Sequence, residues 1–322
     1  MSVKLAVAIV AHGNRALLLE ALDTLSGPGR PTVPHTIHVL DNASEDGTTD
    51  AVRERHPNVD LVAQNFRNGF GANHNRLMAR TEAPLHLILN DDATVEPGAI
   101  DALVQHLANN PEAAVAAPRI TYPDGRHQAT AFRFPSPSTC LLSLAALGQF
   151  GIEQRVVNAP AKVDWASGCA LLLRRSLVEQ VGPFDEEFYM FSEETDLQRR
   201  LLTRGGETHV VPHAIVRHHV RASTADDPSR RIVEFWRSRR RYWAKHYPPL
   251  EGKAARLALG AQYAALAGLA RTRSLPGPLR RLAPNLPRIE LQLHAQNALH
   301  GPTGPGLRES ADQWNAAHGV AR

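Results

Sequence analysis

Two adjacent carboxylates follow a short apolar run in residues 88–97, which read ILNDDATVEP. These acids are Asp91 and Asp92. Burial of an unpaired carboxylate is costly, so such a pair usually faces solvent, a cation or a substrate. The alternative is a loop between a strand and a helix, in which the acids cap the helix. The polar residues elsewhere in the chain must decide between the two.

A second group of acids lies in residues 191–197, which read FSEETDL. A carboxylate within hydrogen-bond reach of a hydroxyl group can remove its proton, and Glu193 and Glu194 are the candidates. Acids also stabilise the N-terminus of a helix, so a charged helix start is the alternative. Asp196 precedes Leu197 and Leu201, whose helical spacing indicates that Asp196 has a structural role.

Two more segments combine polar side chains with glycine. LDNASEDG (40–47) carries acids and amides that could bind a nucleotide base and ribose, although Ser44 and Asp46 are also ordinary helix-capping residues. NFRNGFGANHN (65–75) offers the backbone amides of Gly69 and Gly71, and both phosphate-binding loops and tight turns use such amides. Neither segment alone distinguishes a ligand site from a structural turn.

A pair of histidines follows an apolar run in HAIVRHHVRAST (213–224). His218 and His219 could bind a metal ion, because neutral imidazole is a common metal ligand. A solvated strand end is the alternative for such an isolated pair.

Apolar strands alternate with helical patterns in the first half of the chain. We predict strands at 5–11, 36–42, 59–64, 85–91 and 113–120, and helices at 15–25, 47–56, 71–81 and 96–110. This order is typical of a parallel sheet with helices on both faces. Ligands of such sheets bind beyond the carboxyl ends of the strands, where AHGN, LDNASEDG, QNFRNGFG and NDDA all lie.

The composition is that of a soluble globular protein, with 43% hydrophobic and 21% charged residues among 322. Cys140 and Cys169 are too few and too far apart for a disulfide framework or a Cys-rich zinc site. The first apolar run is too short for a signal peptide, and no stretch approaches the length of a spanning helix. We therefore expect a cytoplasmic protein.

Charge is unevenly distributed along the chain. From Arg217 onward, 18 Lys and Arg stand against 7 Asp and Glu, whereas the preceding residues are acidic. Residues 230–248 mix arginines with Phe235, Trp236, Tyr242 and Trp243 at helical spacing. Such a helix suits anionic lipid or nucleic acid, or it packs on the domain with its arginines solvated. Residues 254–270 predict an alanine-rich helix, and beyond Ser274 prolines and glycines predict poor order.

Four stretches, VAIVAHGNRALLLEALDTL, VLDNASEDGT, NFRNGFGANHNRLM and LILNDDATVEPGAI, together resemble the N-terminal signature of family-2 glycosyltransferases. Residues 163–219 resemble the acceptor half of the bacterial rhamnosyltransferase-like branch. The resemblance implies the α/β GT-A fold, with a mostly parallel central sheet flanked by helices, over residues 1–224. The donor-binding half would cover about 1–120 and the acceptor half about 121–224. A basic helical extension (225–274) and a Pro/Gly-rich tail (275–322) would follow.

The resemblance also implies roles for the donor side of the site. Asn90-Asp91-Asp92 stands at the family's metal motif, and Asp92 at its metal-binding position. A divalent cation, Mg²⁺ or Mn²⁺, would bridge the pyrophosphate there. His218, with His219 second, would reach the metal or the diphosphate. The residues expected around the donor nucleotide and sugar are Asp41, Asn42, Ser44, Asp46, Asn68, Gly69, Asn73 and Asp91.

On the acceptor side, Glu194 stands where relatives have the aspartate base, and Glu193 is the second candidate. Trp165, Ser167 and Gly168 match a loop that flanks the acceptor in relatives. The AHGN loop after the first strand has Gly13 where relatives usually have asparagine, which argues against a role for this loop beyond backbone contacts.

The implied function is inverting transfer of a sugar, first of all rhamnose, from a dTDP- or UDP-sugar. The acceptor would be a polysaccharide or a polyprenyl-diphosphate-linked glycan of the cell envelope. The alternatives are a nucleotide-sugar-binding protein without catalysis and a nucleotidyltransferase. Asp41, Asp92 and Glu194 argue against lost catalysis. We expect the protein to bind peripherally to the anionic inner face of the cell membrane, and we expect no nucleic-acid partner.

Overall fold

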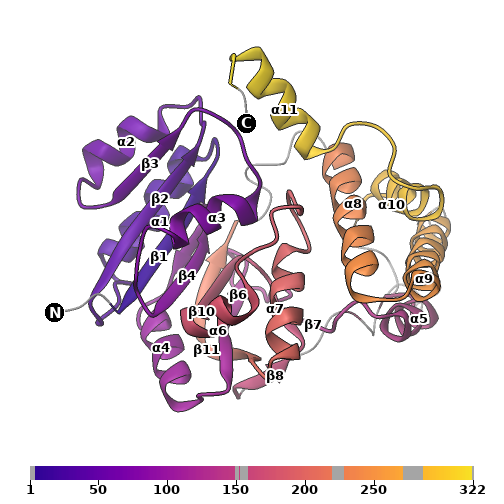
Figure 1. The fold of residues 1–322 in the computed structure, drawn as a ribbon, viewed down its shortest axis with the longest axis horizontal. Coiled ribbons are helices and arrows are strands. Elements are labelled where there is room, and N and C mark those ends of the chain that lie inside the picture. The colour runs from indigo at the N-terminus through magenta and orange to yellow at the C-terminus, as the bar shows by residue number, and fades with distance from the viewer. Residues whose placement is uncertain (1–3, 149–151, 153–158, 220–227, 271–285, 321–322) are drawn as a thin grey trace.

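The computed structural model describes residues 4–148, 152, 159–219, 228–270 and 286–320. Its first part alternates strands and helices as predicted (Figure 1). The strands are β1 (Leu5–Ala11), β2 (His35–Asn42), β3 (Asp60–Gln64), β4 (Leu85–Asn90), β5 (Ala93–Val95) and β6 (Ala113–Thr121). The helices are α1 (Arg15–Ser26), α2 (Thr48–Arg55), α3 (Phe70–Met78) and α4 (Ala99–Asn109).

The middle of the chain adds shorter strands and three helices. The strands are β7 (Ala131–Phe132), β8 (Ala161–Val163), β9 (Trp165–Ala166), β10 (Ala170–Arg174) and the long β11 (Glu207–His218). The helices are α5 (Pro137–Ala145), α6 (Arg175–Val181) and α7 (Glu193–Thr203). The two glutamates of FSEETDL therefore begin α7.

The main sheet of the described residues has nine strands, in the order β3-β2-β1-β4-β10-β6-β11-β5, with β8 also paired to β11. The pairs from β3 to β4 are parallel. Strand β10 runs antiparallel between β4 and β6, so the sheet is mixed. The predicted α/β architecture is confirmed. The insertion of β10 does not follow from the order of strands along the chain, because it joins residues far apart in sequence.

Helices cover both faces of this sheet. On one face, Leu18, Leu22 and Leu25 of α1 pack with Leu103 and Leu107 of α4 against the strands. On the other face, the apolar residues come from α3, α6 and α7. Strands buried on both sides need near-continuous apolar runs, which is why LAVAIVA forms β1.

The C-terminal part is helical, with α8 (Pro228–His246), α9 (Pro249–Leu269), α10 (Arg288–His300) and α11 (Leu307–Ala317). Trp236, Tyr242 and Trp243 of α8 are buried in a cluster with α9 and α10. The interpretation of these aromatic side chains as a lipid-facing surface is therefore wrong, and the helix packs on the rest of the protein instead. None of the described helices combines the length and the apolar character needed to cross a bilayer.

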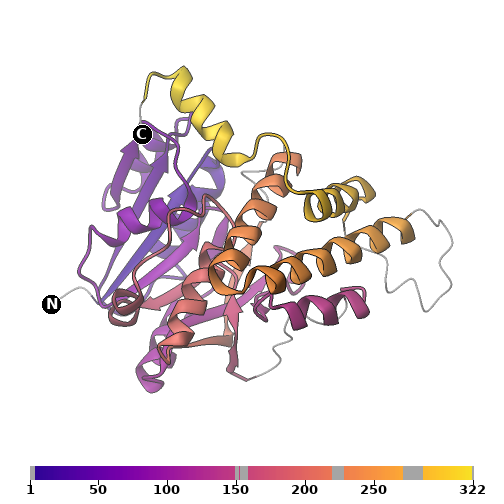
Figure 2. The same cartoon turned by 45° about the vertical axis from the view of Figure 1, so that its right-hand side comes forward.

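The expectation of poor order beyond Ser274 is wrong for two segments, because α10 and α11 lie there. Their apolar pattern is weak in the sequence. In α10 the buried set includes Glu290 and Asn297 beside Leu291 and Ala298, so no clean apolar stripe marks the helix. Figure 2 shows α10 alongside α9, and α11 reaching back toward the strands of the first half. The remaining residues of the tail, 275–285 and 321–322, lie outside the described residues.

Candidate functional site

A cavity of about 580 Å³ lies beyond the carboxyl ends of β1, β2 and β4. It gathers residues from the start, the middle and the end of the chain. Many of the predicted site residues line it: Asn42, Asn68, Asn73, Asn90, Asp91, Asp92, Ser167, Gly168, Glu193, Glu194 and His218. The position agrees with the rule that open α/β sheets bind ligands at this edge.

One wall of the cavity carries Asp92 and His218. His218 Nε2 lies 3.0 Å from Asp92 Oδ1 and 3.3 Å from Asn90 Nδ2. His218 Nδ1 donates to Gln128 Oε1 at 3.2 Å. Burial opposes protonation of the imidazole, but its neighbours Cys169 and Asp92 outweigh burial and raise the pKa of His218 to about 10. Asp92 Oδ1 is buried, and His218 is its ion-pair partner.

This donor set fits a hard divalent cation. Carboxylate and amide oxygens are the ligands that Mg²⁺ and Mn²⁺ prefer, and Asp92 and Asn90 supply them. Imidazole binds metal ions in its neutral form, so a cation here would replace the proton shared between His218 and Asp92. His219 does not line the cavity and instead donates its backbone N–H to Asp92 O at 3.0 Å.

Asp91 lies beside Asp92 but is held by the loop after β1. Its Oδ2 accepts from His12 N at 3.2 Å and from Asn14 Nδ2 at 3.3 Å. Burial, followed by the charge of Asp92, raises the pKa of Asp91 to about 7. The AHGN loop therefore positions the acid pair through one backbone and one side-chain hydrogen bond.

Glu193 and Glu194, at the N-terminus of α7, also line the cavity. Phe191 and Ser192 before them have φ values of 70° and 67°, an uncommon conformation for residues with a side chain. Burial raises the pKa of both carboxyls, and for Glu193 the charge of Glu194 raises it further. The Oε2 atoms of both are buried without a hydrogen-bond partner among the described residues.

The two glutamates face different neighbours. A Cβ added to Gly168 would lie 3.6 Å from Glu194 Cγ, so Glu194 packs against the predicted acceptor loop. A Cβ added to Gly71 would lie 3.7 Å from Glu193 Cβ, so Glu193 packs against the start of α3. The buried Arg239 of α8 lowers the pKa of Glu194 against the effect of burial.

The amides of the donor side hold each other in place. Asn42 Oδ1 accepts from Asn68 N at 2.8 Å and from Gln64 Nε2 at 2.5 Å. Gln64 also donates to Asn73 Oδ1 at 3.1 Å. These bonds join the loop after β2 to the start of α3. Gly69 also lets the start of α3 lie close to the backbone of Tyr189, because a Cβ on residue 69 would lie 2.4 Å from Tyr189 O.

The structure keeps several predicted residues out of the cavity lining. Asp41 accepts from Ser44 N at 3.0 Å and from Thr49 Oγ1, so its carboxylate shapes the loop itself. Trp165 stacks on Phe132 at 4.5 Å in the apolar cluster under α8. The predicted residues that do not line the cavity are Asp41, Ser44, Asp46, Gly69, Trp165 and His219.

The C-terminal helices form a wall that sequence reasoning missed. Leu286 and residues of α8, α10 and α11 line the same cavity, among them Arg231, Glu290, His294 and Ser310. Arg231 Nη2 lies 3.1 Å from Glu290 Oε2, both largely buried. No pattern in the sequence relates these residues to loops about 200 positions earlier.

Helix α11 also binds the predicted donor loop directly. Asn315 Oδ1 accepts from Arg67 N at 2.7 Å, and Asn315 Nδ2 donates to Arg67 O at 3.0 Å. The guanidinium of Arg67 lies 4.2 Å from the Trp314 ring centroid, and Trp314 Nε1 donates to Glu45 Oε2 at 3.1 Å. The chain end thus packs over the loops after β2 and β3.

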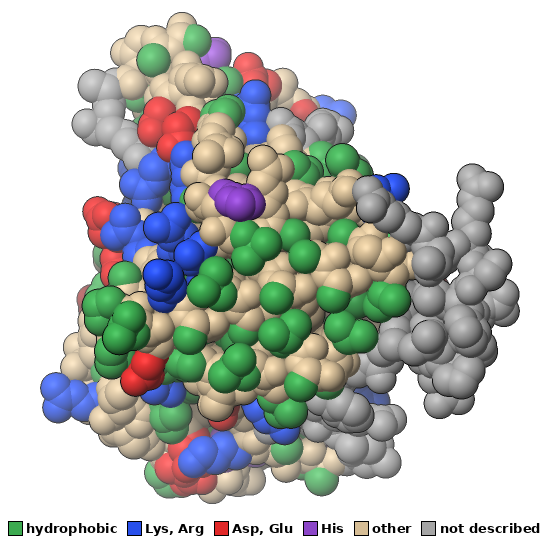
Figure 3. Space-filling view, turned by 90° about the vertical axis from the view of Figure 1, so that its right-hand side faces the viewer, with side chains coloured by type: hydrophobic (Ala, Val, Ile, Leu, Met, Phe, Trp, Pro, Cys, Tyr) green, Lys and Arg blue, Asp and Glu red, His purple; other side chains and the backbone are tan. Residues whose placement is uncertain are grey.

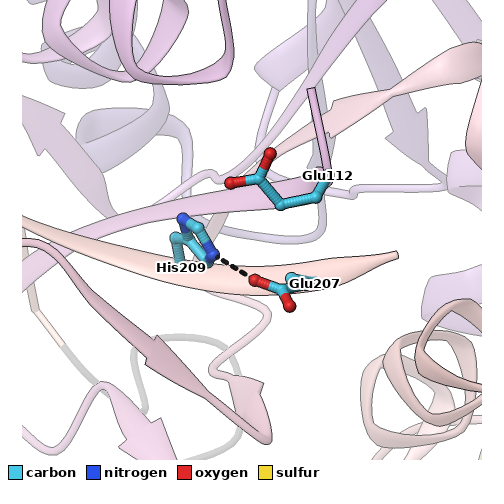
Figure 4. Close-up of side chains that lie close together, drawn as sticks. All are labelled: Glu112, Glu207 and His209. Atoms are coloured by element: carbon cyan, nitrogen blue, oxygen red, sulfur yellow. Dashed lines mark hydrogen bonds and ion pairs between the residues drawn. The ribbon is translucent and has the colours of Figure 1, made fainter. Parts of the chain in front are cut away.

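A separate group of possible metal ligands, Glu112, Glu207 and His209, lies elsewhere (Figure 4). These residues stand at the beginnings of β6 and β11, at the opposite end of those strands from the cavity. His209 Nε2 lies 2.9 Å from Glu207 Oε2, and Lys162 also pairs with Glu207. The other ring nitrogen of His209, Nδ1, lies 2.8 Å from His106 Nε2. Since this group lies at the far end of the strands from Asp92 and His218, it is no part of the predicted cation site.

Comparison with known proteins agrees with this geometry. The family described as "Glycosyltransferase like family 2" matches residues 3–244. An N-acetylglucosaminyl-diphospho-decaprenol L-rhamnosyltransferase of Mycobacterium tuberculosis is 33% identical over 225 residues, covering 64% of this chain and 73% of the relative. The rhamnosyltransferase WbbL of Escherichia coli K12 is 24% identical over 226 residues, covering 66% of this chain and 83% of the relative.

Solved structures show the same fold. The mannosyltransferase PcManGT from Pyrobaculum calidifontis, in complex with GDP-Man and Mn²⁺, superposes with a TM-score of 0.60 at 19% identity, covering 93% of this chain and 88% of that one. GalNAc-T7 with UDP, GalNAc and Mn²⁺ gives a TM-score of 0.58 at 12% identity, covering 99% of this chain and 58% of that one. Both likenesses show the GT-A fold.

Proposed function

Because the chain belongs to glycosyltransferase family 2, we propose that it is an inverting enzyme that moves rhamnose to a hydroxyl group of a polyprenyl-diphosphate-linked or polysaccharide acceptor in cell-envelope glycan synthesis. The chain is a glycosyltransferase that uses a nucleotide-sugar donor. The sugar, the acceptor and the stereochemistry are the proposed part. The observation that carries the proposal is that Asp92, His218 and Glu194 line one cavity.

In this mechanism the acceptor hydroxyl attacks the anomeric carbon while the nucleotide diphosphate leaves from the opposite face. Glu194 accepts the proton of the hydroxyl, and its raised pKa brings it closer to the neutral range in which a general base works best. Asp92, with Asn90 and His218, would hold a divalent cation, which neutralises the charge that develops on the departing diphosphate. Asn42, Asn68 and Asn73 would border the nucleotide and sugar.

Two relatives support the choice of sugar and acceptor. By their names, the mycobacterial and the Escherichia coli proteins are rhamnosyltransferases, and the former acts on a diphospho-decaprenol-linked N-acetylglucosamine. We therefore propose dTDP-rhamnose as the first donor and a polyprenyl-diphosphate-linked sugar as the acceptor, with UDP-sugars second. Asp92 and Glu194 both line the cavity, which favours an active enzyme over a protein that only binds nucleotide sugars.

The test is a donor panel. Purified protein with Mg²⁺ or Mn²⁺ is incubated with dTDP-rhamnose, UDP-sugars and GDP-mannose in the presence of a polyprenyl-diphosphate-linked N-acetylglucosamine. We expect acceptor-dependent release of dTDP and a product whose anomeric configuration, measured by NMR, is inverted. Preference for another donor would show that the transferred sugar is not rhamnose. A retained configuration would exclude inversion by a single displacement. No transfer from any donor would contradict the proposed activity.

A further inference from the structure

One face of the molecule carries many exposed apolar side chains. On α9, the exposed residues between 254 and 268 are all apolar or glycine: Ala254, Leu257, Ala261, Ala264, Ala265 and Gly268. Their spacing places them on one side of the helix. On the neighbouring α5, Leu141 and Leu142 are 53% and 51% exposed, and Ala145 is exposed beside them. These nine residues are called the α5–α9 face.

Figure 3 shows this surface from the front, with apolar side chains spread over it and Lys and Arg gathered beside it. Exposed apolar surface is costly in water, and a contiguous patch usually marks a binding surface. Helix α5 carries no charged residue, and from residue 252 to 269 α9 carries no acid. The face therefore lacks the charges that normally keep an exposed helix in water.

A basic cluster borders the face at the beginning of α9. It consists of Arg240, Lys253 and Arg256. Arg256 Nη1 donates to Leu299 O at 2.9 Å, and a Cβ on Gly301 would lie 3.0 Å from Arg240 Nη1, so both arginines meet at the end of α10. In the described part of the chain, neither Arg240 nor Lys253 forms an ion pair. The cluster is thus left for an anionic partner.

Buried apolar residues of α9 also pack toward the cavity. Leu286 lines the cavity and packs on a cluster that includes Leu266 and Ala267 at the end of α9.

We propose that the α5–α9 face docks on an anionic lipid bilayer, with its apolar side chains in the interfacial layer and the basic cluster against the lipid phosphates. Apolar side chains beside Lys and Arg are the combination that interfacial helices use. A second copy of the chain fits less well, because the face has no acids to place opposite the basic cluster. The inference deepens the proposed function, on which it rests for the lipid-linked acceptor.

Vesicle sedimentation tests the proposal. We expect the protein to pellet with vesicles of phosphatidylglycerol and phosphatidylcholine, to pellet weakly with phosphatidylcholine alone, and to be released by salt. Ala261→Glu places a carboxylate in the face and should reduce binding at least tenfold. The matched control is Ala108→Glu, which makes the same change at an exposed position of α4 and should bind like the wild type.

The charge component has its own pair of variants. Each basic residue near an anionic surface contributes about a fivefold factor in binding, so Arg240→Gln with Lys253→Gln should weaken binding about 25-fold. Arg53→Gln with Arg55→Gln on α2, at the other end of the molecule in Figure 1, removes the same net charge and should change binding little. If both double variants lost vesicle binding equally, net charge alone would explain the attraction, and a specific docking face would be contradicted.

Two further measurements separate this inference from the proposed function. Transfer to a short, water-soluble acceptor should be unchanged in Ala261→Glu. If the wild-type protein transfers sugar to this acceptor but binds no vesicles, only the docking inference is wrong. Analytical ultracentrifugation reports the oligomeric state. A wild-type dimer that Ala261→Glu converts to a monomer, without vesicle binding, would make the face an interface between copies and overturn the proposal.

Discussion

At the scale of residues, two pairs of adjacent acids line the cavity, and in each pair the charge of one member raises the pKa of the other. Asp92 raises the pKa of Asp91, and Glu194 raises that of Glu193. Like charges at close range in a buried site cannot all ionise at neutral pH. The cavity therefore holds less negative charge than its composition suggests. This lowers the electrostatic repulsion of a diphosphate that binds together with a cation.

Asp92→Asn should lower kcat about 100-fold or more, because an amide cannot supply the negative charge that holds the cation under the diphosphate. Mn²⁺ affinity, measured by calorimetry on the protein without donor, should fall in parallel. Asp124→Asn, in an exposed turn, is the control and should change neither quantity. Unchanged Mn²⁺ affinity in Asp92→Asn would show that the cation binds elsewhere.

Glu194→Gln should reduce kcat by about 10²–10⁴-fold with little effect on donor affinity, since the amide keeps the shape but accepts no proton. Glu193→Gln should be milder, because Glu193 packs against α3 and not against the acceptor loop. Rate measurements with saturating acceptor decide the matter. The opposite ranking of the two variants would move the base to Glu193.

Arg239 is a positioning residue for this base. Its guanidinium is buried, its Nε and Nη1 have no hydrogen-bond partner among the described residues, and its charge favours the ionised form of Glu194. Arg239→Met should shift the acid limb of the kcat/KM profile to higher pH, because Glu194 must lose its proton before it can act. Arg239→Lys should restore part of the shift, whereas a uniform loss of activity at all pH values would indicate misfolding only.

At the scale of elements, α11 is the least expected part of the site. It reaches the donor loop through two hydrogen bonds between Asn315 and the backbone of Arg67. A helix at the end of the chain thus stabilises a loop that follows β3. The loop in turn carries Asn68, which lines the cavity.

Asn315→Ala should raise the Kd for the nucleotide sugar about tenfold, because two hydrogen bonds that order the loop are lost. Asn109→Ala, at an exposed position of α4, is the matched control and should leave the Kd unchanged. Calorimetric titration with donor gives both values. If Asn315→Ala bound donor normally, α11 would cover the loop without ordering it.

At the scale of the whole molecule, two neutral histidines lie inside the protein. Burial lowers the pKa of His74 and of His86 to about 3, and their ring nitrogens have no hydrogen-bond partner among the described residues. The unfolded chain would protonate them near 6.5. Between pH 6.5 and about 3 the unfolded state therefore binds more protons, and the stability of the fold decreases as the pH falls.

Each histidine should contribute a slope of about 1.4 kcal/mol per pH unit in this window. His74→Phe should remove one such slope, because His74 packs between Phe70 and Phe184 and a third aromatic ring suits that place. Urea unfolding of both proteins at pH 7, 6 and 5 measures the difference. Parallel losses of stability in the two proteins would assign the acid sensitivity to other groups.

The sequence alone was enough for the first half of the fold. The strands and helices from β1 to α4 depend on local apolar patterns, although some of these strands pair with distant segments, as β4 does with β10. The ends of these strands follow from the same local patterns. The candidate residues Asn42, Asn68 and Asp92, which lie at or after those ends, could therefore be named before the cavity was known. The roles of these residues and the division into donor and acceptor halves stay predictions.

Only the tertiary structure decided the rest, because the deciding contacts join residues far apart in sequence. The pairing of β11 with β5 and β6 turns His218, and not His219, toward Asp92. The packing of α7 on the acceptor loop distinguishes Glu194 from Glu193. The aromatic side chains of α8 could have faced lipid or protein by their spacing, and their burial under α9 and α10 depended on how these helices pack, which the spacing does not show. An apolar period shows that a helix has a buried side, but only the folded chain determines what covers it.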